Sequence, residues 1–408
     1  MKIGIDISQV VYGTGVASYT SNLIENLAKI DKKNQYVLFG TSLRNLSKLN
    51  DLKERLKDYQ NFQFKIFPIP PTILEILWNR LHVIPVEKFI GEIDIFHSSD
   101  WTQPPVKSKS TKKITTVHDM VVYLFPSSVH PRILTNQMRR LGHVKKEVEA
   151  IIADSQTTKE DIIKFMEINR QKITVIPLAA SSIFKPQDDS KINEVTAKYK
   201  IKKPYILSVA TQEPRKNIQK LLDVFGKIVS ERPQFHLVLA GKYGWGRSLP
   251  AHSSLSGSTE RSPSNVLRAH SSESKTGRQG FHSPENVTWT GYVPQEDLPA
   301  LYAGSRVFVY PSLYEGFGLP VLEAMACGTP VITSNNSSMA EIAKDAAILV
   351  DPRSESQLMR AIELVLGLNL ENYQKMVRAS LDRARQYSWT KTARETLKIY
   401  EEVAKNSE

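Results

Sequence analysis

Residues 307–333 read VFVYPSLYEGFGLPVLEAMACGTPVIT, and their pattern predicts a strand, a turn, a helix and a second strand. It opens with the apolar run Val307–Tyr310, which is short enough to be a buried strand of a parallel sheet. Pro320 stands where the first helical residue is expected, so a helix is predicted from there to about Cys327. A glycine and a proline then end the helix, and Val331–Thr333 predicts the next strand. This order of elements is typical of a parallel α/β sheet.

The turn between the first strand and the helix is the best candidate for a functional site. Gly316 and Gly318 allow a tight turn to which another backbone can come close. Two carboxylates flank the turn, Glu315 before the glycines and Glu323 within the helix. The helix N-terminus would lie at the C-terminal edge of the sheet, where a doubly wound fold binds phosphorylated ligands. The alternative is a plain strand–turn–helix unit with two solvated glutamates.

The motif E-G-F-G-L-P-x-L-E-A-M-A-C-G-x-P-V at residues 315–331 resembles the E-x7-E signature of retaining GT-B glycosyltransferases. This is the large family 4, group 1 type, which includes sucrose synthase and many bacterial mannosyl- and glucosyltransferases. The resemblance implies an α/β fold of two Rossmann-like parallel domains that face each other across a cleft. It also implies a nucleoside-diphosphate sugar donor, with Glu315 beside the transferred sugar and Glu323 on the ribose hydroxyls. The donor-binding residues that it implies in the turn are Gly316, Phe317, Gly318 and Leu319.

Length and composition indicate an ordinary globular protein. A chain of 408 residues predicts two domains, and 41% hydrophobic with 24% charged residues is the usual balance for a soluble protein. The sequence contains no run of 18 apolar residues, so no transmembrane helix is expected. The first residues, MKIGIDISQV, predict a strand rather than a signal peptide. The single cysteine, Cys327, excludes an internal disulfide and is expected to be buried. We therefore expect a cytoplasmic protein.

The net charge of +12 suggests an anionic partner, such as a phosphorylated substrate, an anionic membrane or a nucleic acid. Basic residues cluster at 107–113 and again at 139–146, where their spacing fits one side of a helix predicted over 137–150. That helix could rest on lipid headgroups at the inner face of the membrane, or it could present a solvated basic face. No nucleic-acid-binding motif is present, so an anionic membrane is preferred over nucleic acid as the partner.

Strands alternate with helices along the chain, which predicts two consecutive parallel α/β domains. The N-terminal, acceptor-side domain is expected at residues 1–186 and the nucleotide-sugar domain at 187–388, with a connection over about 177–203. Helices are predicted at 16–29, at 217–231 with Asn217 as its cap, and at 389–405. By analogy with the GT-B fold, the last helix would return to the first domain. The predicted strands are 3–7, 36–39, 62–67, 94–97, 114–118, 151–153, 173–176, 205–210, 235–240, 287–290, 306–310, 331–333 and 348–350.

The segment of about residues 246–285 breaks this alternation. It is rich in serine, glycine and proline and poor in apolar residues, so we expect a flexible insertion. Its histidines, His252, His270 and His282, are too scattered to predict a metal site.

Two backbone turns are further candidates for donor binding. Gly13 and Gly15 follow the first strand and could hold a phosphate with backbone N–H groups, but the full dinucleotide-binding pattern is absent. The resemblance places the corresponding loop near the donor diphosphate. It also assigns Val293, in the G-Y-V turn of residues 291–293, to recognition of the nucleobase.

His118 follows an apolar strand, at the end where ligands collect in a parallel sheet. Its position alone fits a structural histidine as well as a functional one. In the family, the equivalent His-Asp pair contacts the transferred sugar, so the resemblance implies a catalytic role.

Arg215 and Lys216 stand between a strand and a predicted helix N-terminus. Two cations there are unfavourable with the helix dipole unless an anion lies nearby, and a diphosphate would supply it. The resemblance assigns both residues to the donor diphosphate. No D-x-D pair occurs in the chain, so we expect no metal and no cofactor other than the donor substrate.

The sequence therefore predicts a retaining, metal-independent glycosyltransferase that moves a hexose from a nucleoside-diphosphate sugar to a glycan, lipid-linked or small-molecule acceptor. The E-P-R-K-N and S-S-M-A-E variants resemble the mannosyltransferase side of the family, so mannose from GDP-mannose is preferred over a UDP-sugar. A sugar-nucleotide epimerase with two such domains and a non-catalytic interaction protein on a transferase scaffold remain alternatives.

Overall fold

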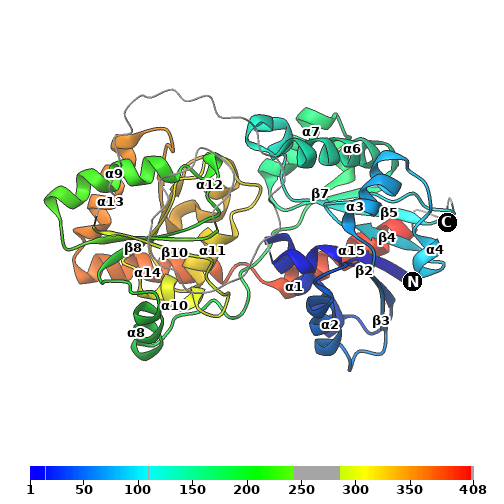
Figure 1. Cartoon of the computed structure of the whole chain (residues 1–408), viewed down its shortest axis with the longest axis horizontal. Helices are drawn as coiled ribbons and strands as arrows, with labels where there is room; N and C mark the ends of the chain where they lie inside the picture. Colours follow the sequence, from blue (N-terminus) through cyan, green and yellow to red (C-terminus); the bar gives the residue numbers. More distant parts are fainter. Residues whose placement is uncertain (14, 109, 243–284, 406–408) are drawn as a thin grey trace, which may run out of the picture.

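Thirteen strands form two separate parallel sheets in the computed structural model, which describes residues 1–13, 15–108, 110–242 and 285–405. The first sheet has the order β3-β2-β1-β4-β5-β6-β7 and the second the order β10-β9-β8-β11-β12-β13. Figure 1 shows the two sheets side by side, each with its own helices. The predicted fold class, two Rossmann-like parallel domains, is confirmed. The strands are β1 (Lys2–Asp6), β2 (Gln35–Thr41), β3 (Phe62–Phe67), β4 (Ile95–Ser98), β5 (Lys112–Val117), β6 (Ala150–Ala153), β7 (Ile173–Val175), β8 (Tyr205–Val209), β9 (His236–Ala240), β10 (Val287–Gly291), β11 (Val307–Tyr310), β12 (Val331–Ser334) and β13 (Ile348–Val350).

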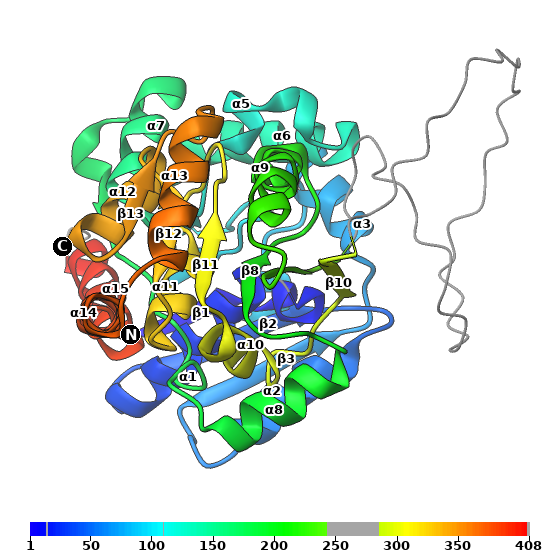
Figure 2. The same ribbon diagram turned by 90° about the vertical axis from the view of Figure 1, so that its left-hand side faces the viewer.

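Helices cover both faces of each sheet, which explains why the central strands are continuous apolar runs. In the second domain, α9 and α13 pack together on one face, while α10, α11 and α14 lie on the other (Figure 2). The helices are α1 (Gly15–Ile30), α2 (Leu46–Arg55), α3 (Pro71–Leu74), α4 (Glu87–Ile90), α5 (Val121–Leu124), α6 (Pro131–Glu147), α7 (Gln156–Met166), α8 (Asp189–Lys198), α9 (Ile218–Glu231), α10 (Leu298–Gly304), α11 (Leu319–Ala326), α12 (Ser337–Ala343), α13 (Glu355–Leu366), α14 (Leu370–Ala384) and α15 (Trp389–Lys405). Short helical turns include η1 (Ser8–Tyr12), η2 (Glu75–Arg80) and η5 (Pro214–Lys216).

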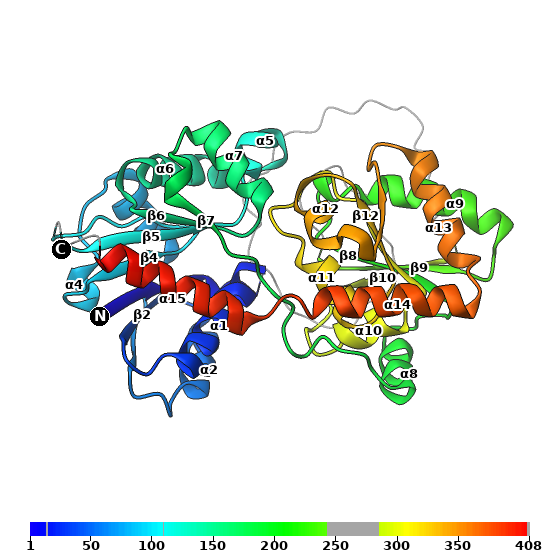
Figure 3. The same cartoon turned by 180° about the vertical axis from the view of Figure 1, so that it is seen from behind.

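The last helix, α15, lies against α1 of the first domain, so the two ends of the chain share one core (Figure 3). Tyr400 of α15 is buried, and its hydroxyl lies 2.7 Å from Nδ1 of His97 on β4. Thr392 donates a hydrogen bond of 2.7 Å to the carbonyl of Pro177. The chain therefore crosses between the domains twice, after β7 and again before α15.

Several predicted element boundaries are wrong. The connection expected over 177–203 contains α8, whose first turn is capped by Asp188 accepting a hydrogen bond from the N–H of Lys191. The helix predicted over 137–150 begins earlier, at Pro131, and ends at Glu147, because residue 150 already belongs to β6.

The predicted capping role of Asn217 is also wrong. Asn217 has a left-handed backbone conformation, and its side chain accepts no hydrogen bond from α9. Its amide instead donates to the carbonyls of Pro311 and Pro352, which ties η5 to the loop after β11. The sequence could not distinguish an amide that caps a helix from one that joins two loops.

Other sequence predictions fall beyond the reach of the structure. The serine-rich insertion predicted at about 246–285 lies almost wholly outside the described residues, as do its three histidines. The domain boundary at residue 186 stays a prediction. Cys327 is buried at the end of α11, as expected. Among the described residues, no helix is long and apolar enough to cross a bilayer.

Candidate active site

Glu315 lies in the loop from β11 to α11, and its carboxylate is buried in a set of hydrogen-bond donors. Oε1 accepts hydrogen bonds from Lys216 at 2.7 Å, from Ser312 at 2.7 Å and from the Tyr310 hydroxyl at 3.0 Å. Oε2 lies 2.9 Å from a guanidinium nitrogen of Arg215. The loop thus brings Glu315 to both cations that follow β8, because β8 and β11 are neighbours in the sheet.

The two cations decide the charge of Glu315. Burial by itself raises the pKa of a carboxyl group, but Lys216 and Arg215 outweigh it and lower the pKa of Glu315 to about 2. The same pairing raises the pKa of Arg215 despite its burial. Arg215 also donates 2.6 Å to the carbonyl of Tyr314, so its guanidinium is fixed on the loop that holds Glu315.

The two adjacent cations therefore do not need an external anion, contrary to the sequence prediction. Glu315 supplies an anion from within the chain, and α9 begins only at Ile218, after the turn that holds both cations. Arg215 also contacts Glu213 at 3.3 Å, so two carboxylates, Glu213 and Glu315, face the two cations. The Nε atom of Arg215 is buried without a hydrogen-bond partner.

His118 follows β5 and pairs with a carboxylate that the sequence analysis missed. Its Nδ1 lies 2.6 Å from Oδ2 of Asp154, the residue that follows β6. Burial lowers the pKa of His118, but Asp154 outweighs it and the pKa is raised. Because a carboxylate accepts hydrogen bonds, this pairing holds a proton on Nδ1 and fixes the ring. Tyr19 packs against the ring, with centroids 4.7 Å apart.

The two domains are in close contact at Gly316. A Cβ atom at this position would lie 1.8 Å from the carbonyl oxygen of His118, so only glycine fits. The carbonyl of Gly316 accepts hydrogen bonds from Ser155 at 2.6 Å and from Thr158 at 3.1 Å, both of the first domain. The loop that holds Glu315 is therefore held by both domains.

Two further contacts join the domains beside this loop. The hydroxyl of Tyr314 donates 2.7 Å to Asp161 of α7. Glu341 of α12 accepts hydrogen bonds from the N–H groups of Gln156 and Thr157, at 2.9 and 2.7 Å, in the first turn of α7. A carboxylate is stabilised there by the free N–H groups and the dipole of the helix.

Glu323 lies apart from this cluster, on α11. The hydroxyl of Tyr302 donates to its Oε2 at 3.1 Å. Burial raises the pKa of Glu323, and the hydrogen bond from Tyr302 lowers it by less, so the pKa lies at about 7. The pKa values of the two glutamates of the motif are therefore shifted in opposite directions: Glu315 is ionised at neutral pH, and Glu323 changes charge near neutral pH.

The other predicted donor-binding residues lie after β1, after β10 and at the start of α11. Gly15 begins α1, and a Cβ there would lie 3.8 Å from a methyl group of Leu319, so the loop after β1 approaches α11. Two further glycines have a left-handed backbone conformation: Gly13, with φ 63° after η1, and Gly318, with φ 100° before α11. Phe317 and Val293 belong to one apolar cluster. The structure brings Arg215, Lys216 and Glu315 into direct contact, and Gly316 against His118. No such contact joins Glu323 or Val293 to them among the described residues.

Sequence reasoning missed the groups that hold these side chains. Asp154 directly follows a buried strand, the same signal that singled out His118, and Ser312 comes two residues after the end of β11. Tyr310 is the last residue of β11, and no sequence pattern predicts that its hydroxyl reaches Glu315.

Comparisons with known proteins agree with this fold. The family model for Glycosyltransferase Family 4 matches residues 13–180, and that for Glycosyl transferases group 1 matches residues 191–383. The O-antigen chain mannosyltransferase B of Escherichia coli is 31% identical over 408 residues, which are 98% of this chain and 99% of the relative. Among solved structures, a glycosyltransferase from Rickettsia africae has a TM-score of 0.67 at 17% identity over 99% of both chains. Anabaena HepE in complex with UDP-glucose has a TM-score of 0.67 at 13% identity, over 98% of this chain and 100% of the other.

Two parallel-sheet α/β domains that meet through loops at the ends of their strands define the GT-B class of glycosyltransferases. Within that class, the chain belongs to glycosyltransferase family 4, group 1 type.

Gly316→Ala tests the domain contact. The added methyl group would collide with the carbonyl of His118, so the loop must shift by about 1 Å, and turnover should fall by roughly 10²-fold. The matched control is Gly142→Ala, because Gly142 lies in α6 with no atom within 4 Å of the added methyl group. That control should keep full turnover and gain about 0.5–1 kcal/mol of stability. Equal turnover in both variants would contradict the contact.

Proposed function

We propose that the protein is a retaining mannosyltransferase that uses GDP-mannose and acts on a glycan or lipid-linked acceptor in the synthesis of a surface polysaccharide such as O-antigen. The observation that supports a transferase most directly is Glu315, ionised between Arg215 and Lys216 and next to His118 through Gly316. Mannose is preferred because the full-length relative is an O-antigen chain mannosyltransferase. A UDP-sugar is the other donor class, in line with the complex of HepE.

The reaction transfers the sugar from its phosphate to an acceptor hydroxyl, and the departing nucleoside diphosphate gains negative charge. In our proposal Arg215 and Lys216 stabilise that charge, because cations in a buried site act far more strongly than in water. Glu315 then stabilises the positive charge that grows at the anomeric carbon. These three groups are already fixed by hydrogen bonds, so little reorganisation is needed in the transition state.

In this proposal His118 positions the transferred sugar. Asp154 holds Nδ1, which leaves Nε2 of the ring as the atom that can bind a sugar hydroxyl. Gly13, Gly15 and the turn Gly316–Leu319 would bind the diphosphate through backbone N–H groups, with Val293 at the nucleobase and Glu323 at the ribose hydroxyls.

A panel of donors tests the activity itself. The purified protein should consume GDP-mannose faster than GDP-glucose, UDP-glucose or UDP-galactose, read by mass spectrometry of the released nucleotide. With an acceptor glycan, the new linkage should keep the α configuration of the donor, read by proton NMR. An inverted linkage, or conversion of the donor to an isomeric sugar nucleotide without transfer, would contradict the proposal.

Arg215→Ala and Lys216→Ala should each lower turnover by about 10²-fold or more, since each removes a group that stabilises the departing charge. For the same reason turnover should survive excess EDTA, because the protein's own cations meet the charge and the chain has no D-x-D pair.

Arg385→Ala is the matched control, because this exposed arginine pairs with Asp382 one helical turn away, and the substitution should leave turnover unchanged. Near-normal turnover in the double variant of Arg215 and Lys216 would refute the assignment. Loss of activity in EDTA that magnesium or manganese restores would refute metal independence.

The two glutamates should respond differently to substitution and to pH. The ionised carboxylate of Glu323 accepts hydrogen bonds from ribose hydroxyls better than the neutral acid does. Donor affinity should therefore rise as the pH increases through about 7, the pKa of Glu323. Glu323→Gln should remove this pH dependence and weaken donor binding roughly ten- to a hundredfold.

Glu315→Gln should instead lower turnover with little change in affinity, because its charge acts mainly in the transition state. Its effect should not vary between pH 5 and 9, since its pKa is about 2. Donor titrations and initial rates across this pH range decide both points. The same profile for the two variants would contradict the division of roles.

We further propose that the protein works at the cytoplasmic, anionic face of a membrane. The basic side of α6 is narrower than predicted, because Arg140 is buried and donates to Ser99, Thr115 and Thr116. The adjacent surface, however, combines positive charge with exposed apolar side chains. Four of these follow one another closely after α3, each 41% to 56% exposed: Ile76, Leu81, Val83 and Ile84. A hollow of about 390 Å³ beside them is lined by Arg80, Arg132 and Arg139.

Vesicle sedimentation tests this surface. The protein should bind vesicles that contain phosphatidylglycerol more than vesicles of phosphatidylcholine alone, and binding should weaken with salt. Leu81→Ser and Arg139→Ser should each reduce binding. Leu364→Ser, at a residue equally exposed on α13 of the other domain, should leave it unchanged. Equal losses at all three positions, or no binding at all, would contradict the proposal.

A further inference from the structure

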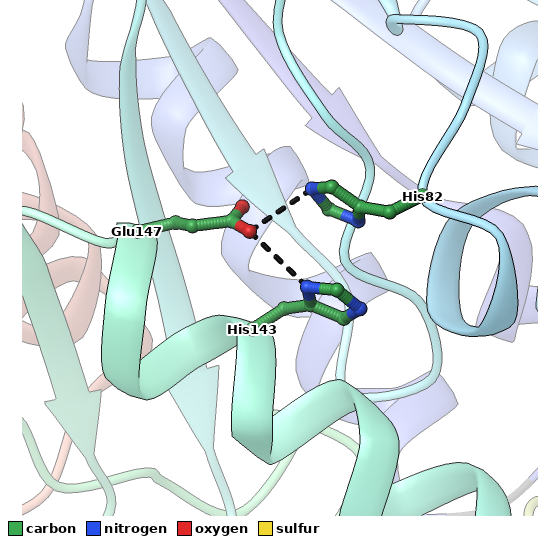
Figure 4. A group of neighbouring side chains, drawn as sticks. All are labelled: His82, His143 and Glu147. Atoms are coloured by element: carbon green, nitrogen blue, oxygen red, sulfur yellow. Dashed lines mark hydrogen bonds and ion pairs between the residues drawn. The ribbon is translucent and has the colours of Figure 1, made fainter.

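Two histidines and a glutamate converge on the surface of the first domain, away from the candidate active site (Figure 4). His143 and Glu147 are one turn apart on α6, and His82 comes from the segment after η2. Oε1 of Glu147 lies 3.0 Å from Nε2 of His82 and 3.1 Å from Nδ1 of His143. The three ligand atoms lie within 4.8 Å of one another, and each side chain is between 22% and 24% exposed.

The hydrogen bonds on the outer side of each ring fix where the protons are. Nδ1 of His82 lies 2.8 Å from the carbonyl of Trp78, and Nε2 of His143 lies 3.2 Å from the carbonyl of Asn79. A carbonyl only accepts, so each of these nitrogens must donate an N–H. In the neutral rings, the two inner nitrogens then direct lone pairs at the same oxygen of Glu147. Three acceptors face one another, and a cation is needed between them.

Protons on both inner nitrogens are one way to supply that positive charge. They would make both rings cationic, although the rings stack with centroids 3.9 Å apart and planes at 10°. The ammonium group of Lys113 already contacts the other oxygen of Glu147. The two stacked rings would then carry like charges and repel each other. A single ion bound to both lone pairs avoids the stacked charges.

We propose that His82, His143 and Glu147 form a zinc site that fastens the segment after η2 to α6. Two imidazole nitrogens and one carboxylate oxygen are ligands that Zn²⁺ accepts, and a fourth position stays open for water. The backbone carbonyls of Trp78 and Asn79 hold the distal N–H groups, as outer partners of zinc-bound histidines commonly do. Lys113 orients the carboxylate so that Oε1 faces the ion.

The spacing suits an ion of this size. Ligand atoms about 2.1 Å from a tetrahedral zinc lie roughly 3.4 Å apart, close to the two separations measured from Oε1. Parallel rings cannot both point at one ion within their planes, so binding must tilt them apart. His82 can allow this movement, because it lies in a surface segment outside any helix or strand.

The backbone of this segment indicates what the site would do. His82 and Ile84 both have positive φ, 53° and 61°, which costs energy and is rare for a β-branched residue. Trp78 secures the far end by donating 2.9 Å to the carbonyl of Ile84. A metal bond at His82 would hold the other end, so the ion would stabilise this exposed segment and take no part in sugar transfer.

The test uses the full-length protein after dialysis against a chelator, with zinc alone as the probe. Calorimetric titration should give one zinc per chain, and cobalt should give the visible absorption of a four-coordinate site. His82→Ala, His143→Ala and Glu147→Gln should each weaken zinc binding by roughly tenfold or more. The control is His236→Ala, on β9 of the other domain, and it should bind zinc as the unchanged protein does.

Zinc should also slow proteolytic cleavage within residues 80–84, in the unchanged protein and in the control but not in His82→Ala. Circular dichroism checks that each variant is folded. Glu147→Gln preserves the size of the side chain, so it removes the carboxylate without the loss of packing that His143→Ala causes. Turnover with GDP-mannose should be the same with and without zinc. The proposal is overturned if the chelated protein binds no zinc, or if His82→Ala and His143→Ala bind it as tightly as His236→Ala.

Discussion

The arrangement of the site depends on the ion pairs of Glu315 with Arg215 and Lys216. A buried carboxylate without partners would be strongly destabilising, and here Arg215 and Lys216 keep it ionised. These residues lie about a hundred positions apart, yet the adjacency of β8 and β11 in the parallel sheet brings their loops together. Topology therefore places the cations, and the hydrogen bonds of Tyr310 and Ser312 place the carboxylate between them.

A second constraint is that the loop of Glu315 belongs to both domains. Gly316 touches the carbonyl of His118, and its own carbonyl binds Ser155 and Thr158 of the first domain. The contact of Glu341 with the first turn of α7 lies beside it. Because these contacts surround the proposed donor site, any change in the angle between the domains must move Glu315 relative to His118. The position of Glu315 relative to His118 is thus linked to the angle between the domains through a few hydrogen bonds.

Much of this could be read from the sequence, because it depends on local patterns. Apolar runs between turns predicted the strands and the two-domain fold, and the E-x7-E motif identified the family. What the sequence could not show depends on side chains that meet across the fold. Asp154 binds His118, and Asn217 joins two loops instead of capping α9. The sequence also could not show that Glu315 neutralises part of the positive charge of Arg215 and Lys216, for which a diphosphate was the expected anion. No sequence pattern predicts which loops become neighbours.

We propose that Arg215 and Lys216, despite their pairing with Glu315, form a site for the two phosphates of the donor nucleotide. Comparing the affinities of GDP and GMP tests it most directly, because the two ligands differ only in the β-phosphate. The account predicts that GDP binds at least tenfold more tightly than GMP to the unchanged protein, and that the difference disappears in the double variant Arg215→Ala, Lys216→Ala. Equal affinities in the unchanged protein, or a difference that survives in the double variant, would contradict it.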